Sequence, residues 1–201
     1  MQIIEKIKTN RILSSPNEIQ KICLDKLKLN PLPNVKSELW RLSNKSKFSR
    51  CLDFSLNNKT RNFEIPFQNN SKNIIRLIIG EDSFSNIEKE DYSVKKINND
   101  EIKKYLKKNI SNFDQNEHWS DLLNLSLSSE RNILGLKING TKIPPIEILS
   151  HASSEFFNSK TLIIFVGENC KIDLLQVNLG KERSTLSQST YISLEENSSV
   201  H

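Results

Sequence analysis

The sequence predicts an α+β protein in which an N-terminal helical region is followed by stacked, parallel β-strands. Three observations carry this prediction: a 28-residue internal repeat near the C-terminus, helical stripes of apolar residues before it, and turn residues between strand-like runs. Shifted by 28 positions, the segment 164–172 falls on 192–200, so that apolar residues superimpose and Glu168-Asn169 falls on Glu196-Asn197. A repeat of this length lies in the range of solenoid folds.

Each copy of the repeat has the same order of parts. A strand-like run leads into Gly-Glu-Asn or Glu-Glu-Asn, where Asn suits a left-handed backbone, and an alternating apolar run follows, as in Ile172, Leu174 and Val177. A weaker copy begins at Leu134, turns at Asn139-Gly140 and continues through Ile143, Ile146 and Ile148. Residues 131–201 are therefore expected to form the first coils of a β-solenoid.

The end of the chain should expose a strand edge. A solenoid coil buries its apolar face only against the next coil, and Val200-His201 falls partway through a coil. Its last strand would present unpaired backbone groups. We expect this truncated, open end to be covered by further coils or a partner, or to drive self-association end to end.

Three stretches before the repeat have helical spacing. The first should begin at Pro16, capped by Ser15, and end near Leu29 before Asn30-Pro31. The second should follow an Asn98–Asp100 cap, and the third should span 117–128. Their apolar stripes are Ile19, Ile22, Cys23 and Leu27; Ile102, Tyr105, Leu106 and Ile110; and Trp119, Leu122, Leu123 and Leu125.

These patterns divide the chain into three regions. Residues 1–50 form an N-terminal helical region with a basic arm, 51–130 a mixed strand and helix region, and 131–201 the start of the β-solenoid. Within 51–100 we expect an irregular segment with short strands. The strongest is 73–79, expected to be buried on both faces except at Arg76, whereas Pro66 confines 62–67 to a sheet edge.

Positive charge is concentrated at the N-terminus. Residues 1–50 hold 11 basic and four acidic residues, while the whole chain carries a net charge of +5. This arm leaves a nucleic-acid-binding module as an alternative. Its charges alternate with apolar residues at helical spacing, as do Lys103, Lys104, Lys107 and Lys108, so a solvated helix face is the expected reading.

No residue pattern predicts a catalytic, cofactor-binding or metal site. Cys23 is expected in the core, Cys51 on the surface and Cys170 as a small turn residue, and the spacing fits neither a disulfide framework nor a CxxC motif. His118 lies beside Glu117 and near Asp121, but neighbouring helical positions do not share a face. His151 has no supporting ligands nearby. No apolar run approaches the length of a membrane span or signal-peptide core, so a cytoplasmic location is expected.

Several segments resemble one known family in order along the chain. The segment 33–43, with Trp40, resembles a P-x-x-K-x-E-x-W-R-x-T motif, and Leu123-Asn124 precedes the first coil as a Leu-Asn pair does in that family. The runs 162–169 and 196–201 look like its V-V-G-E-N-A and E-N-A-x-V-E-H coils. In these segments the chain resembles SufD, a subunit of the SUF machinery that assembles iron-sulfur clusters.

The resemblance implies a non-catalytic scaffold subunit built on a right-handed parallel β-helix. It implies partners as well: a SufB-like subunit that pairs with the β-helix and the ATPase SufC, which binds a C-terminal helical domain. The family's cluster-building residues would lie beyond His201, so no cofactor is expected in this stretch and the iron-sulfur cluster belongs to the full complex. Another β-solenoid, binding or acting on polysaccharide, remains an alternative, although its acids, such as Asp173, Glu195 and Glu196, are scattered.

Overall fold

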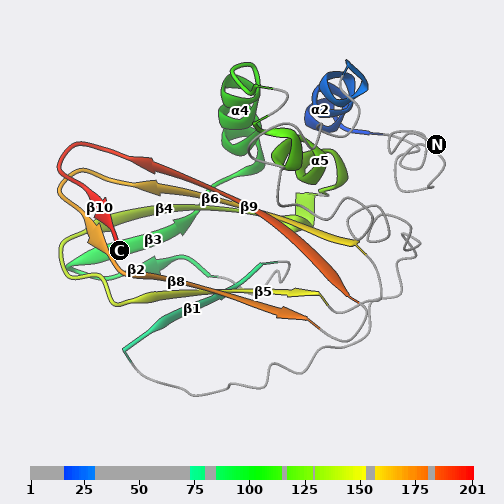
Figure 1. Ribbon diagram of the computed structural model, residues 1–201. Helices are drawn as coiled ribbons and strands as arrows, with labels where there is room; N and C mark the ends of the chain where they lie inside the picture. The colour runs from blue at the N-terminus through cyan, green and yellow to red at the C-terminus, as the bar shows by residue number, and fades with distance from the viewer. Residues whose placement is uncertain are drawn as a thin grey trace.

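The protein is built in layers: a group of helices lies over a large β-sheet, which lies over a smaller one (Figure 1). The computed structural model describes residues 16–29, 73–79, 85–114, 117–128, 130–152, 157–180 and 184–201, without the side chains of residues 131 and 157. Within these ranges the fold is α+β with parallel sheets, as the sequence predicts.

The large sheet has the strand order β2-β3-β4-β6-β9. Its parallel part joins β4 (Ile133–Gly140), β6 (Phe157–Val166) and β9 (Thr185–Leu194). Ile133 pairs with Thr161, and Thr161 pairs with Ser189, so each strand is displaced by 28 residues from the next. The predicted stacking of 162–166 beneath 191–194 is confirmed, since Ile164 pairs with Ile192 and Val166 with Leu194.

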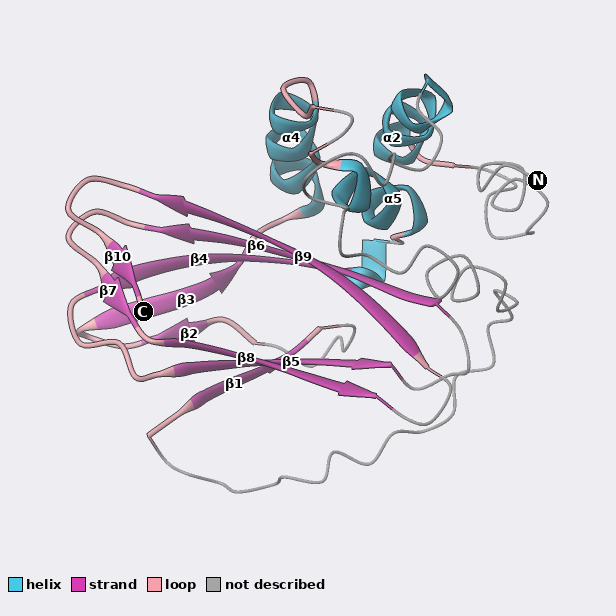
Figure 2. Ribbon diagram, viewed as in Figure 1, coloured by secondary structure: helices cyan, strands magenta, loops and turns pink. Residues whose placement is uncertain are grey.

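The smaller sheets repeat this displacement. In the order β1-β5-β8, strand β5 (Ile146–Ala152) pairs in parallel with β8 (Leu174–Gly180), beginning with Ile146 against Leu174. The short strands β7 (Lys171–Ile172) and β10 (Ser199–Val200) pair in parallel at the corner between the two larger sheets (Figure 2). The same displacement of 28 residues therefore holds on all three faces of the stack.

The stacked corners use the residue type that the repeat predicts. Asn169 and Asn197 have φ angles of 57° and 54°, the left-handed region that Asn tolerates better than most residues. The amide of Asn169 donates to the carbonyl of Glu196 at 2.9 Å, which ties one corner to the next. The Glu-Asn repeat in the sequence thus marks equivalent turns in space.

The other edge of the large sheet is antiparallel. Strand β3 (Tyr92–Lys96) pairs with β4 and with β2 (Ile87–Glu88). The β3–β4 pairing reaches Gly140, whose φ of 126° and 2.3 Å approach of a built Cβ to the carbonyl of Asp91 leave no room for a side chain. The short strands β2 and β3 fit the expected irregular region with short strands, but the pairing of β3 with β4 was not predicted because β4 lies some forty residues later in the chain.

Strand β1 (Ile75–Ile78) pairs in parallel with β5. The sequence predicted that 73–79 would be buried on both faces except at Arg76, and this is wrong. Ile75 and Leu77 are buried, Ile78 is partly exposed and Ile74 is 42% exposed. Alternate residues of the strand, Ile75 and Leu77, face the core between the sheets, whereas the other face of this sheet is not covered by a described layer.

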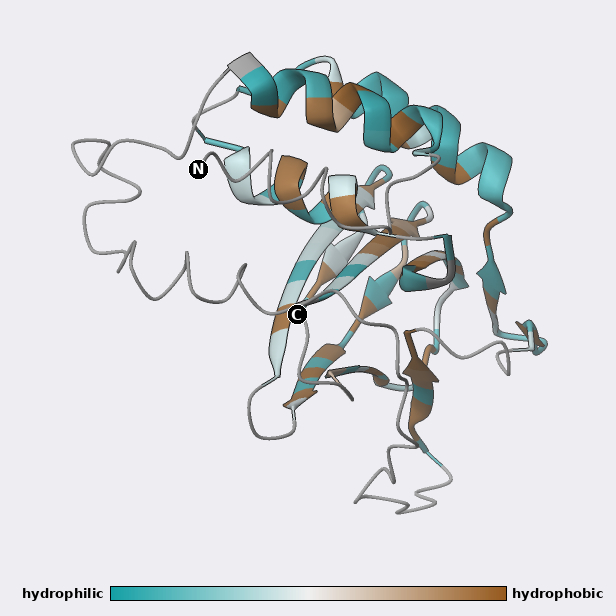
Figure 3. Ribbon diagram, turned by 90° about the vertical axis from the view of Figure 1, so that its right-hand side faces the viewer, coloured by the Kyte–Doolittle hydropathy of each residue, from teal (hydrophilic) through white to brown (hydrophobic). Residues whose placement is uncertain are grey.

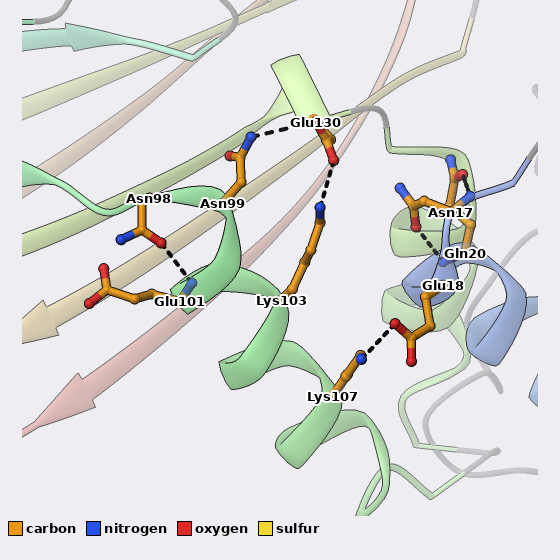
Figure 4. A network of polar contacts seen from close by, with 9 residues as sticks. All are labelled: Asn17, Glu18, Gln20, Asn98, Asn99, Glu101, Lys103, Lys107 and Glu130. Carbon is orange, nitrogen blue, oxygen red and sulfur yellow. Dashed lines mark hydrogen bonds and ion pairs between the residues drawn. The ribbon is translucent and has the colours of Figure 1, made fainter.

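The three described α-helices match the predicted stretches closely. They are α2 (Glu18–Leu29), α4 (Asn99–Ile110) and α5 (Trp119–Leu127), with a short 3-10 turn, η3 (Glu130–Asn132), before β4. Asn98 caps α4 by accepting from the amide of Glu101, as expected. Helix α2 instead begins after Asn17, which accepts from the Gln20 amide at 3.0 Å while Gln20 accepts from that of Asn17 (Figure 4). This reciprocal capping box replaces the expected Ser15 cap.

The apolar residues form two clusters on opposite sides of the large sheet. One joins the inner faces of α2, α4 and α5 to Ile163, with Phe165 and Tyr191 packed against it. The other fills the space between the large and small sheets and includes Ile138, Ile148 and Ile164. Figure 3 shows the apolar helix residues turned toward the sheet and the polar ones turned away. The large sheet is therefore buried on both faces at its centre.

Several sequence expectations fall outside the described residues. They are the basic arm before Pro16, the segment 33–43 with Trp40, Cys51 and the edge strand 62–67. None of the described helices is long and apolar enough to cross a membrane.

Candidate interaction surface at the outer strands

Strands β8, β9 and β10 are each the last strand of their sheet, and we call them the outer edge. The register places them next to one another, because β9 follows β6 in the large sheet while β8 and β10 follow β5 and β7. A parallel strand paired on one side leaves amide and carbonyl groups free on the other. Among the described residues, this edge offers the longest such row, on the 10-residue β9.

Large apolar side chains are exposed along the outer edge. Ile192 is 41% exposed and Leu194 51%, although their partners one strand inward, Ile164 and Val166, are fully buried. Leu175 on β8 is 57% exposed. Ile192 and Leu194 continue the inward-facing alternation of the stack, and they are exposed because no described strand covers them. Leu175 pairs with Glu147, whose carboxylate bonds Arg76, so it lies on the outward face of its sheet.

A polar pair lies among these apolar residues. The hydroxyl of Thr190 donates to the side-chain carbonyl of Gln176 at 3.0 Å, linking β9 to β8 across the interior of the stack. The corresponding residues one strand inward are Leu162 and Ile148, both fully buried. The outer edge thus replaces an apolar contact by a hydrogen bond that tolerates water.

The helix-facing side of β9 is firmly held. Ser189 donates to the carboxylate of Asp121 on α5 at 2.6 Å, and Tyr191 stacks on Phe113 with ring centroids 6.0 Å apart. Burial is the largest cause that raises the pKa of Tyr191 well above its ordinary value. With one face fixed to the helices, β9 presents its free edge as a rigid surface rather than a loose terminal strand.

The strand beneath, β6, is fixed to α5 by a buried polar cluster around Asn124. The Asn124 side chain donates to the carbonyl of Lys160 at 2.6 Å, and Ser159 donates to the carbonyl of Asn124, also at 2.6 Å. Ser128 lies 2.9 Å from the hydroxyl of Ser159. All three residues are fully or almost fully buried. Sequence patterns single out Asn124 only as part of a Leu-Asn pair and do not predict its role in joining helix to strand.

The structure gives separate roles to the His and Asp residues that the sequence raised as possible catalytic or metal-binding groups. Asp121 bonds Ser189, while the ring of His118 stacks on Phe113 with a centroid separation of 4.5 Å. The described residues contain no group of three or more His, Cys, Asp or Glu side chains arranged to hold a metal ion. His151 lies on β5, where its partner in the register is Leu179.

The lysine face of α4 is partly neutralised by other elements. Lys103 lies 3.1 Å from Glu130, and Lys107 lies 2.6 Å from Glu18 (Figure 4). The hydrogen bond to Glu130 is the main cause that raises the pKa of Lys103. These contacts join α4 to α2 and η3, in keeping with the expected solvated helix face.

Cys23 and Cys170 are fully buried and free, as expected for a core residue and a small residue at a corner. Burial raises the pKa of the Cys23 thiol to about 12 and raises that of Cys170 as well. Both remain protonated thiols near neutral pH, so neither has the character of a nucleophile or metal ligand.

A cleft of about 610 Å³ lies away from the outer edge, between β1 and β2. Two of its charged lining residues have partners: Arg76 bonds Glu147, and Glu88 lies 2.7 Å from Lys95. The third, Lys89, is exposed. Because most of this charge is paired, we assign the candidate surface to the outer edge.

Comparison with protein-family models, curated proteins and solved structures found no match to this chain.

Proposed function

We propose that this chain is the N-terminal part of a SufD-like scaffold subunit, and that its stacked strands begin a right-handed parallel β-helix. The single observation that carries the proposal is the common 28-residue register on all three faces, which ends in an exposed outer edge. In this proposal the regions 1–50, 51–130 and 131–201 are the helical arm, the mixed region and the start of the β-helix.

The residues that resemble the family occupy structurally demanding positions, which supports the proposal. Asn124 of the Leu-Asn pair is fully buried and joins the helix to the second strand layer. Asn169 and Asn197, from the two Glu-Asn coils, both adopt the left-handed backbone of stacked corners. A chance similarity of sequence would not be expected to fall on residues with such specific structural roles.

A scaffold function fits the chemistry of the outer edge. An exposed strand binds another strand by backbone hydrogen bonds, and the exposed apolar side chains beside it supply burial and specificity. We propose that β9 and β8 are covered in the cytoplasm by a SufB-like subunit or by further coils of the parent subunit, and that a SufC-like ATPase belongs to the same complex. Cluster chemistry would take place in that complex, with this chain supplying shape and contact surface.

The test is binding of the purified chain to SufB-like and SufC-like subunits under reducing conditions. We expect the SufB-like subunit to be retained, and the double change Ile192→Glu with Leu194→Glu to weaken its binding at least tenfold by burying charge at the interface. Ile74→Glu is the matched control, because Ile74 is comparably exposed at 42% but lies beside β1. Equal binding by both variants, or none by the wild type, would refute the proposal.

Self-association through the same edge has its own readout. We expect the elution volume of the purified chain to depend on its concentration and the Ile192→Glu, Leu194→Glu variant to remain monomeric. A monomer at every concentration would show that the outer edge does not bind a second copy. The nucleic-acid alternative predicts a gel shift that weakens steeply with salt and is indifferent to these substitutions.

A further inference from the structure

A column of polar residues lies inside the stack, where apolar residues would be expected. Asn132, Lys160 and Gln188 are spaced by 28 residues: Lys160 pairs with Gln188 in the large sheet, and Asn132 ends η3 immediately before β4. The neighbouring residues Ser159 and Ser189 bond to α5, so Lys160 and Gln188 project to the opposite side, between the sheets.

Lys160 is a buried cation that forms no ion pair with any residue in the described part of the chain. Lys160 is only 7% exposed. Its ammonium donates to Asn132 Oδ1 at 3.1 Å and to the carbonyl of Ile79 at 3.4 Å. Both acceptors are neutral, and no described carboxylate forms an ion pair with Lys160. Burial accordingly lowers its pKa. A buried charge of this kind costs several kcal/mol unless it is compensated.

Two further side chains that project between the sheets have polar atoms without a hydrogen-bond partner among the described residues. Both side-chain amide atoms of Gln188 are buried and make no hydrogen bond to the described residues. The hydroxyl of Ser150 is likewise buried and unpaired, in a residue that is fully buried. Ser150 follows Leu149, whose carbonyl accepts from the amide of Ile79 at 2.9 Å, so it faces the same part of the interior as the Lys160 ammonium.

We propose that Lys160, Gln188 and Ser150 form a binding site for a small monovalent anion of about the size of chloride or formate. The remaining N–H of the ammonium, the Gln188 amide and the Ser150 hydroxyl supply three donors, and the single positive charge matches a single negative one. Gln188 lies on β9, the last strand of the large sheet, so in this proposal the ion would reach the lysine from the outer edge.

The experiment is a thermal unfolding titration of the full chain at constant ionic strength, in which chloride or formate replaces the bulky anion gluconate. We expect a saturable rise in Tm, roughly 5 °C or more once the free anion exceeds its Kd about 100-fold. Lys160→Met, which keeps the side-chain length but removes the charge, should abolish the rise. Lys104→Met is the matched control, because Lys104 is exposed on α4, and it should retain the full response.

A response of equal size in wild type and Lys160→Met would overturn the proposal, as would no response in the wild type. If Lys160→Met fails to fold, Ser150→Ala and Gln188→Ala test the same site with smaller changes. Each removes one donor and should weaken the anion about tenfold, the effect of a hydrogen bond to a charged group. Unchanged anion affinity in both variants would equally overturn the assignment.

Discussion

Strands β6 and β9 carry equivalent residues in one register but lie in different surroundings. Ile164 and Val166 on β6 are fully buried between β4 and β9, whereas Ile192 and Leu194 on β9 are about half exposed. The other end of the same sheet offers a contrast. There the short strand β2 is the edge, and an ion pair joins Glu88 to Lys95 on β3.

The difference shows which end of the sheet is suited to bind. Short strands and charged side chains discourage pairing with another chain, and the β2–β3 end has both. Strand β9 has 10 residues and exposed apolar side chains, which are features of an interface rather than of a protected edge. The large sheet is therefore protected against further strand pairing at its β2 edge and open to such pairing at its β9 edge.

The largest effect should separate the two strands directly. Ile164→Ala removes a fully buried side chain and should lower the free energy of unfolding by about 2–5 kcal/mol. Ile192→Ala, at the paired position on β9, should cost less than about 1 kcal/mol because much of its side chain already meets solvent. Urea unfolding of both variants measures the difference, and similar losses would show that β9 is covered in solution.

Next in size is the contact of each strand with α5. Asn124→Ala removes the side-chain donor to the carbonyl of Lys160, while Ser159 keeps its bond to the backbone carbonyl of residue 124, and the change should cost about 2 kcal/mol. Asp121→Ala, which removes the acceptor of Ser189 on β9, should cost about 1 kcal/mol because that bond is only partly buried. Chemical denaturation of the pair tests this order. A larger loss for Asp121→Ala would mean that α5 is anchored mainly through β9.

The stacked corners give a smaller effect. Asn169→Ala forces a left-handed backbone on a residue that disfavours it and should cost roughly 1–2 kcal/mol, whereas Asn169→Gly should cost little. Asn197→Ala at the outer corner should cost about the same if that turn persists without a strand above it. A negligible cost at Asn197 alone, measured by thermal unfolding, would show that the outer corner opens in solution.

The last effect is absent at neutral pH and develops only in alkaline solution. The unfolded Cys23 thiol loses its proton above its ordinary pKa of 9.0, while the folded thiol keeps it up to about 12. Stability from this thiol is thus present below pH 9 and is lost as pH rises toward 12, by about 1.4 kcal/mol per pH unit at most. Comparing the pH dependence of urea unfolding in wild type and Cys23→Ala isolates the contribution. Identical slopes would place Cys23 outside the core.

Mass-spectrometric labelling gives a second readout for the thiols. Cys23 and Cys170 should resist alkylation in the folded chain and react in denaturant, because both are fully buried. Cys170 lies at a corner beside β7, so faster labelling there than at Cys23 would report local opening near the outer edge.

The stacking and the helices could be read from the sequence. Alternating apolar residues and Glu-Asn turns repeat at 28 positions, and this local pattern fixes both the strand direction and the register that places Ile164 on Ile192. The stripe from Ile102 to Ile110 and the Asn98 cap located α4 in the same way. The sequence also contains the signal for the polar column, because a shift of 28 positions places Lys160 on Gln188, although the repeat alone did not single out this pair.

Only the tertiary structure decided which groups are covered. Whether β3 pairs with β4, whether Asn124 meets Ser159, and whether Lys160 finds a counter-charge depend on segments that are far apart in sequence. Side-chain periodicity reports the face on which a residue lies, because it follows from backbone geometry over a few residues. It does not report what packs on that face. Burial, and with it the exposed outer edge and the buried lysine, is set by long-range packing.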